Sequence, residues 1–118
     1  MFALVALAPA TLHAQPAAKV YRVGFLGTAS QSGYVREMEW VRAGLRSFGY
    51  EEGRNIVIEY RWAEGDPQRT QEIAAEFAAL KLDAIVAHNT PGAIAAARAT
   101  STIPIVMADG SEIGRAHV

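Results

Sequence analysis

The chain has 118 residues, enough for one small domain, and a formal net charge of −1. Hydrophobic residues make up 51% of it and charged residues 19%, a balance that supports a buried core and excludes an intrinsically disordered chain. The near-neutral charge offers no basic face to a nucleic acid, and the absence of cysteine excludes disulfides and cysteine-based metal sites.

The N-terminal residues resemble part of a secretory signal. Residues 1–9 are apolar and uncharged, and Leu12 and Ala14 stand at the −3 and −1 positions of a cleavage site before Gln15. The basic segment that usually opens such a signal is missing, and the apolar run is shorter than the roughly 20 residues that span a bilayer. We expect residues 1–14 to be a partial signal peptide, followed by a linker over residues 15–20. The alternative is an N-terminal arm, either disordered or docked on the core.

The body of the chain begins with a predicted strand over residues 21–26 and a polar turn over residues 27–32. The next segment, residues 33–48, predicts an amphipathic helix because its large apolar residues recur at alternating spacings of four and three. These residues are Tyr34, Met38, Val41, Leu45 and Phe48. Gly49 is expected to end this helix in the left-handed conformation.

The second predicted strand, residues 55–62, alternates between apolar and polar side chains, which is typical of a strand near a sheet edge. Asp66 and Pro67 then predict the N-cap and first position of a second helix. The buried stripe of this helix is expected to consist of Ile73, Phe77 and Leu80.

Two further strands, residues 84–87 and 103–107, are almost continuously apolar, which is typical of interior parallel strands. Between them, Thr90 and Pro91 predict the start of a third helix over residues 91–99. The whole pattern predicts an α/β fold with a doubly wound parallel sheet in the order 2-1-3-4.

Polar residues follow the first and third strands where each strand ends, at the edge where open α/β sheets bind ligands. The candidate ligand-binding residues are Thr28, Ala29, Ser30, His88, Asn89, Thr90 and Asp109. Simple helix capping or an ordinary polar loop is the alternative for the hydroxyl-bearing residues. The three histidines lack metal-ligand spacing, and the carboxylates form no catalytic set. We therefore expect no enzymatic activity, cofactor or metal.

Four segments of the body resemble the ABC transporter substrate-binding protein family of the tryptophan/tyrosine type. They are RVGFLG at 22–27, GLRSFGYEEGRNI at 44–56, EYRWAEG at 59–65 and TSTIPIV at 100–106. The resemblance implies a type I periplasmic binding fold, of which residues 21–110 would form part of the N-terminal lobe. It further implies a periplasmic, monomeric protein that captures a small solute, with aromatic amino acids among the ligands, and delivers it to an ABC permease. The turns at 28–30 and 89–90 would then line the cleft.

The last eight residues, 111–118, do not continue the α/β pattern. Residues 112–118 back-translate to a sequence that resembles a common sequencing adapter read in frame, so we expect a non-native tail and a longer native protein.

Two other classes remain open. One is a flavodoxin-like or nucleotide-binding enzyme domain that uses residues 27–32 as a phosphate loop, although this loop lacks the usual glycine motifs. The other is the sensor domain of a transcriptional regulator, which would need a helix-turn-helix that residues 1–18 do not supply.

Overall fold

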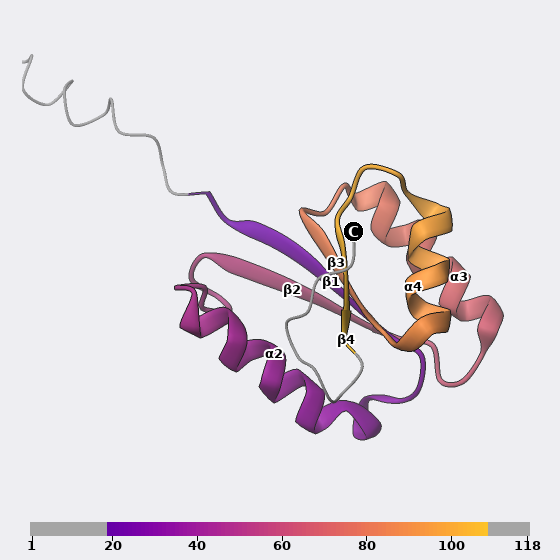
Figure 1. Cartoon of the computed structure of the whole chain (residues 1–118), viewed down its shortest axis with the longest axis horizontal. Coiled ribbons are helices and arrows are strands. Elements are labelled where there is room, and N and C mark those ends of the chain that lie inside the picture. Colours follow the sequence, from indigo (N-terminus) through magenta and orange to yellow (C-terminus); the bar gives the residue numbers. More distant parts are fainter. Residues whose placement is uncertain (1–18, 109–118) are drawn as a thin grey trace, which may run out of the picture.

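The computed structural model describes residues 19–108, whose strands form one parallel sheet in the order β2-β1-β3-β4. The strands are β1 (Tyr21–Gly27), β2 (Ile56–Trp62), β3 (Ala84–His88) and β4 (Ile105–Ala108). The helices are the 3₁₀ turn η1 (Gln31–Tyr34), α2 (Val35–Ser47), α3 (Pro67–Leu80) and α4 (Asn89–Ala99). Helix α2 covers one face of the sheet and helices α3 and α4 cover the other (Figure 1). The predicted α/β class and strand order are confirmed.

Two predicted signals at helix ends, Gly49 after the first helix and Asp66 before the second, are also confirmed. Gly49 has a φ of +90°, and its N–H donates to Arg46 O, while the N–H of Tyr50 donates to Leu45 O. This pair of bonds is the Schellman arrangement that closes a helix on a left-handed residue. At the start of α3, the carboxylate of Asp66 accepts the N–H of Gln68 at 2.9 Å, as expected of an N-cap.

Several predicted element boundaries differ from the structure by one or two residues; for example, the third helix begins at Asn89 instead of residue 91. The first helix begins as the 3₁₀ turn η1 and becomes α-helical only at Val35, so residues 33–48 are not one α-helix. The last strand begins at Ile105 instead of residue 103, because Pro104 has no N–H for the sheet and only its carbonyl bonds, to the N–H of Ile85. Strand β4 also lies at an edge of the described sheet, whereas its apolar sequence predicts an interior strand.

The face beneath α3 and α4 holds a fully buried core, whose members include Leu26, Ile73, Phe77 and Ile85. Gly24 of β1 allows this close packing, since a Cβ at its position would come within 2.8 Å of the Phe77 ring. The predicted stripe of α3 is correct for Ile73 and Phe77. It is wrong for Leu80, the last residue of the helix, whose side chain is exposed.

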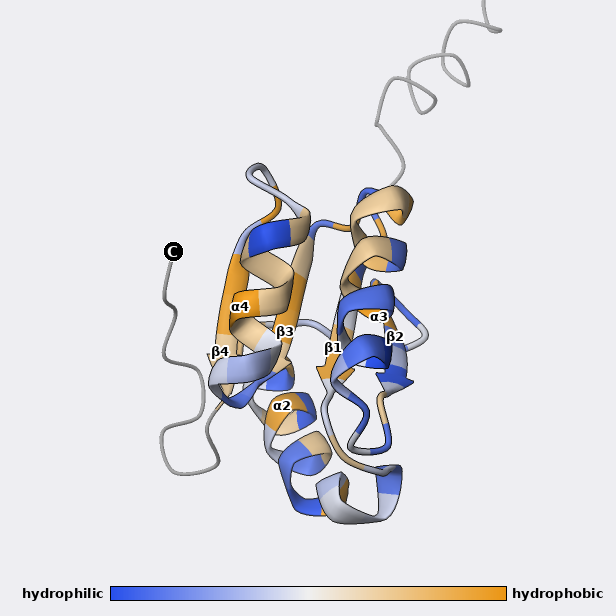
Figure 2. Ribbon diagram, turned by 90° about the vertical axis from the view of Figure 1, so that its right-hand side faces the viewer, coloured by the Kyte–Doolittle hydropathy of each residue, from blue (hydrophilic) through white to orange (hydrophobic). Residues whose placement is uncertain are grey.

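The face beneath α2 is closed near β1 and β2 by Phe25, Tyr34, Met38 and Ile58, all buried. Farther along α2, Val41 and Leu45 are only partly buried, and the prediction that Phe48 belongs to the buried stripe is wrong because it is 83% exposed. The helix ends at Ser47, and the non-helical backbone of Phe48 takes its side chain off the stripe. Figure 2 shows the largely hydrophobic strands β3 and β4, beside helices in which hydrophilic and hydrophobic residues are mixed.

Within residues 19–108, no helix is both long and apolar enough to cross a bilayer.

Candidate ligand-binding site

The carboxyl ends of β1 and β3 lie side by side because the two strands are parallel neighbours, with Leu26 paired to Ala87. This register brings the turn after β1 against the turn after β3. Thr28 and Asn89 make the direct link, since the amide nitrogen of Asn89 donates to Thr28 Oγ1 at 3.0 Å. The structure therefore brings together polar residues that lie 61 positions apart in the sequence.

Asn89 also shapes the start of helix α4. Its φ is +59°, a left-handed conformation that asparagine tolerates better than most residues do. Its side-chain oxygen accepts the N–H of Gly92 at 3.4 Å within the first turn of α4, whose N-cap is His88. The alternative that Thr90 caps this helix is therefore wrong, and the exposed Thr90 keeps its hydroxyl on the surface of the site.

The hydroxyl of Tyr34 links the turn after β1 to the end of β3. Its side chain is 2% exposed, and its hydroxyl oxygen accepts the N–H groups of Thr28 and Ala29 at 2.9 and 3.3 Å. The same oxygen lies 2.8 Å from Nδ1 of His88 and 3.1 Å from Thr28 Oγ1. One buried tyrosine thus holds the β1 turn and the end of β3 in a fixed arrangement.

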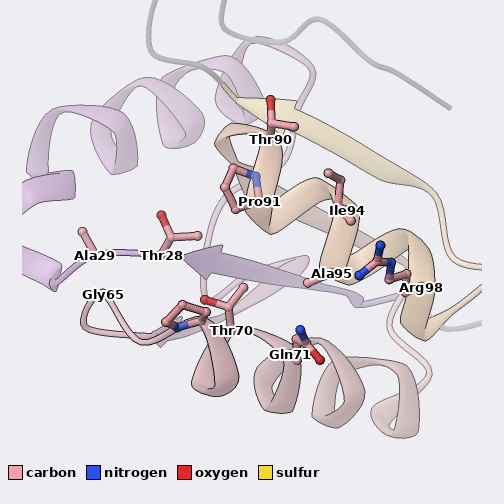
Figure 3. A pocket seen from close by; sticks show the side chains of 11 residues that line it. Thr28, Ala29, Gly65, Thr70, Gln71, Thr90, Pro91, Ile94, Ala95 and Arg98 are labelled. Carbon is pink, nitrogen blue, oxygen red and sulfur yellow. The ribbon is translucent and has the colours of Figure 1, made fainter.

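A groove of about 740 Å³ opens beside this network, between the N-terminal part of α3 and helix α4. Thr28, Ala29 and Thr90 line it at the sheet edge (Figure 3). Pro91 and Ile94 give it an apolar wall on α4. Farther from the sheet edge, the polar lining is completed by Thr70, Gln71 and Arg98. The arrangement suits a small molecule that has both a polar and an apolar part.

Of the other predicted site residues that the structure describes, Ser30, His88 and Asn89 do not line the groove. His88 and Asn89 lie in the hydrogen-bonded network behind it, and the hydroxyl of Ser30 contacts that of Ser32 at 3.1 Å. Asp109 lies outside the described residues.

Sequence reasoning missed Tyr34 as a site residue because its position fits the buried stripe of the first helix. A tyrosine at a buried position usually needs a hydrogen-bond partner for its hydroxyl, and this was the available signal. Thr70, Gln71 and Arg98 have no comparable signal, because they reach the groove only through the packing of α3 against α4.

The opposite, amino edge of the sheet carries a different link between β1 and β3. The carboxylate of Asp83 accepts the backbone N–H of Arg22 at 2.8 Å and pairs with Lys19 Nζ at 2.9 Å. The Arg22 hydrogen bond, followed by that of Lys19, lowers the pKa of Asp83 below its ordinary value. Within residues 19–108, no group of three potential metal ligands gathers at either edge.

Comparison with known proteins identifies the family. The model of the family described as ABC transporter substrate binding protein matches residues 23–118 of the chain. The chain belongs to this family. The family binds substrates for transport and is not enzymatic, which excludes the alternative of a flavodoxin-like or nucleotide-binding enzyme domain.

Individual relatives agree with the family match. A tyrosine-binding protein of Clostridioides difficile (strain R20291) is 46% identical over 63 residues, which are 53% of this chain and 18% of that protein. Among solved structures, the ligand-free, open form of a substrate-binding protein with adhesive properties from Clostridium difficile is 34% identical. The match has a TM-score of 0.69 and covers 75% of this chain and 30% of that one.

A second solved structure was determined in complex with L-Trp. It is an ABC domain from Streptococcus pneumoniae, 25% identical, with a TM-score of 0.69 and the same coverage of 75% and 30%. The matched part of the chain therefore spans less than a third of the length of these relatives, and its four-stranded sheet matches part of their fold.

Proposed function

We propose that this chain forms one wall of the solute site in a periplasmic binding component of an ABC importer, and that the solute is an aromatic amino acid. The observation that carries the proposal is the meeting of the β1 and β3 turns, joined by the Asn89–Thr28 hydrogen bond, at the open edge of the sheet. The periplasmic location is supported by the signal-like residues 1–14.

The chemistry of the groove supports the choice of solute. The first turn of a helix leaves backbone N–H groups without partners in the helix and favours an anion there. At the start of α4, Pro91 has no N–H and the Gly92 N–H goes to Asn89, so the hydroxyl of the exposed Thr90 is best placed to donate to a carboxylate. The apolar wall of Pro91 and Ile94 offers contact to an aromatic side chain.

The size of the chain supports a shared site. An open groove on one lobe encloses a solute only when a second lobe closes over it, as in binding proteins that move about a hinge. Since the chain covers only 30% of each of the two solved relatives, we propose that a second lobe and an ABC permease are the partners of this chain.

Calorimetry on the full-length protein tests the proposal. L-tyrosine or L-tryptophan should give a saturable binding heat, and L-alanine should give far less because it lacks the ring. Thr90→Ala should weaken binding roughly tenfold, the loss of one hydrogen bond to a charged group. Thr102→Val, an exposed threonine outside the groove, is the matched control and should leave the affinity unchanged. Absence of binding to both aromatic amino acids would contradict the proposed solute class.

A further inference from the structure

The hydroxyl of Tyr34 occupies a fixed position beneath the site. Its ring stacks on Trp62 with centroids 5.3 Å apart and meets Phe25 edge to face at 5.7 Å. The ring of His88 lies edge to face on it at 4.6 Å. Because these aromatic neighbours fix the ring of Tyr34, they also fix the position of its hydroxyl oxygen.

The number of hydrogen bonds that the Tyr34 oxygen can donate and accept determines the direction of each bond in the network. A phenol has one hydrogen to donate and two lone pairs that accept. The N–H groups of Thr28 and Ala29 can only donate, and together they use both lone pairs. The phenol hydrogen must therefore go to an acceptor, which is His88 Nδ1 at 2.8 Å when that nitrogen carries no hydrogen, and Thr28 Oγ1 at 3.1 Å when it does.

The orientation of the Thr28 hydroxyl follows from this count. Thr28 Oγ1 already accepts a hydrogen from Asn89 Nδ2, and Tyr34 has no lone pair left for the Thr28 hydrogen. We propose that Tyr34 is a positioning residue that leaves the hydroxyl hydrogen of Thr28 to donate toward the groove, so that a carboxylate oxygen meets Thr28. This inference rests on the proposed function and assigns which end of the amino acid faces the β1 turn.

Hydrogen exchange tests the role of Tyr34 without any ligand. In the full-length protein, a peptide covering residues 26–33 contains the Thr28 and Ala29 amides, and these should exchange more slowly than in an unstructured peptide. Tyr34→Phe keeps the ring and removes the oxygen, so their exchange should accelerate roughly tenfold, the equivalent of one lost hydrogen bond. Tyr60→Phe, which removes a hydroxyl bonded to Glu52 in the same aromatic cluster, should leave them unchanged.

Unprotected amides in the wild type, or equal protection in Tyr34→Phe, would overturn the positioning role. The wild-type measurement decides the question even if Tyr34→Phe does not fold.

Ligand binding tests the donor assignment. Thr28→Ser should bind L-tryptophan within about twofold of the wild type, and Thr28→Val should bind it roughly tenfold more weakly. Tryptamine lacks the carboxylate, so Thr28→Val should not weaken its binding further. An equal loss for both ligands would overturn the assignment. A wild type that binds neither would instead remove the proposed function, and the exchange rates would still decide the role of Tyr34.

Discussion

Strands β1 and β3 are tied together at both ends, and the two ties differ in chemistry. At the carboxyl edge, Tyr34, Thr28, Asn89 and His88 form a part-buried network of hydrogen bonds. At the amino edge, Asp83 makes a partly exposed charged link. Neutral hydrogen bonds inside a protein are little affected by salt, whereas surface ion pairs are screened by it. The comparison indicates that the carboxyl edge is pre-organised, and that the strength of the amino edge depends on pH and salt.

The largest effect should come from crowding the carboxyl edge. A Cβ at Gly27 would lie 2.5 Å from the Trp62 ring and 3.1 Å from the Tyr34 ring. Gly27→Ala must therefore displace both rings, and we expect a loss of roughly 3 kcal/mol in the free energy of unfolding, the upper end for an overpacked site. Urea unfolding monitored by tryptophan fluorescence measures it.

Gly44→Ala is the control for this substitution. Gly44 lies inside α2, and a Cβ added there would have no neighbouring atom within 4 Å, so alanine should stabilise the chain by about 0.5–1 kcal/mol. A Gly27→Ala chain as stable as the wild type would mean that the edge is loosely packed.

An intermediate effect is expected at Asn89. Asn89→Ala removes the bonds to Thr28 and to the Gly92 N–H, and it places alanine in a left-handed conformation. We expect a loss of roughly 2 kcal/mol. Asn89→Gly removes the same bonds but accepts the positive φ, so it should lose about half as much. Thermal unfolding of both variants separates backbone strain from hydrogen bonding, and equal losses would mean that strain contributes nothing.

The smallest effect should come from the amino edge and should depend on pH. The pKa of Asp83 is lowered in the folded chain, so its stabilisation is complete above the ordinary value of 3.8 and is lost as the pH falls through the folded value. Asp83→Asn should therefore be less stable than the wild type at pH 7, with the difference shrinking below pH 3.8 and in high salt. Urea unfolding at both pH values measures this difference, and a constant difference would contradict the charged link.

Much of the fold could be predicted from the sequence because its signals are local. The alternation in β2, the continuous apolar runs of β1 and β3, and the Asp66 and Gly49 end signals each depend on neighbouring residues. The exposure of Phe48 was not predicted, because α2 ends one residue before it and the side chain then points away from the buried stripe.

The site could be predicted only in part. The turns after β1 and β3 are local features at a known kind of edge, and the structure does bring them together. The hydroxyl of Tyr34 reaches His88 across 54 positions, and the groove forms where α3 packs against α4. Such contacts depend on tertiary packing, which periodicity does not encode.

A crystal structure of the full-length protein with L-tryptophan or L-tyrosine tests the central claim most directly. We expect the ligand carboxylate within hydrogen-bonding distance of the hydroxyls of Thr28 and Thr90, with the aromatic ring beside Pro91. A ligand whose carboxylate is bound elsewhere, with no contact to the turns after β1 and β3, would contradict it.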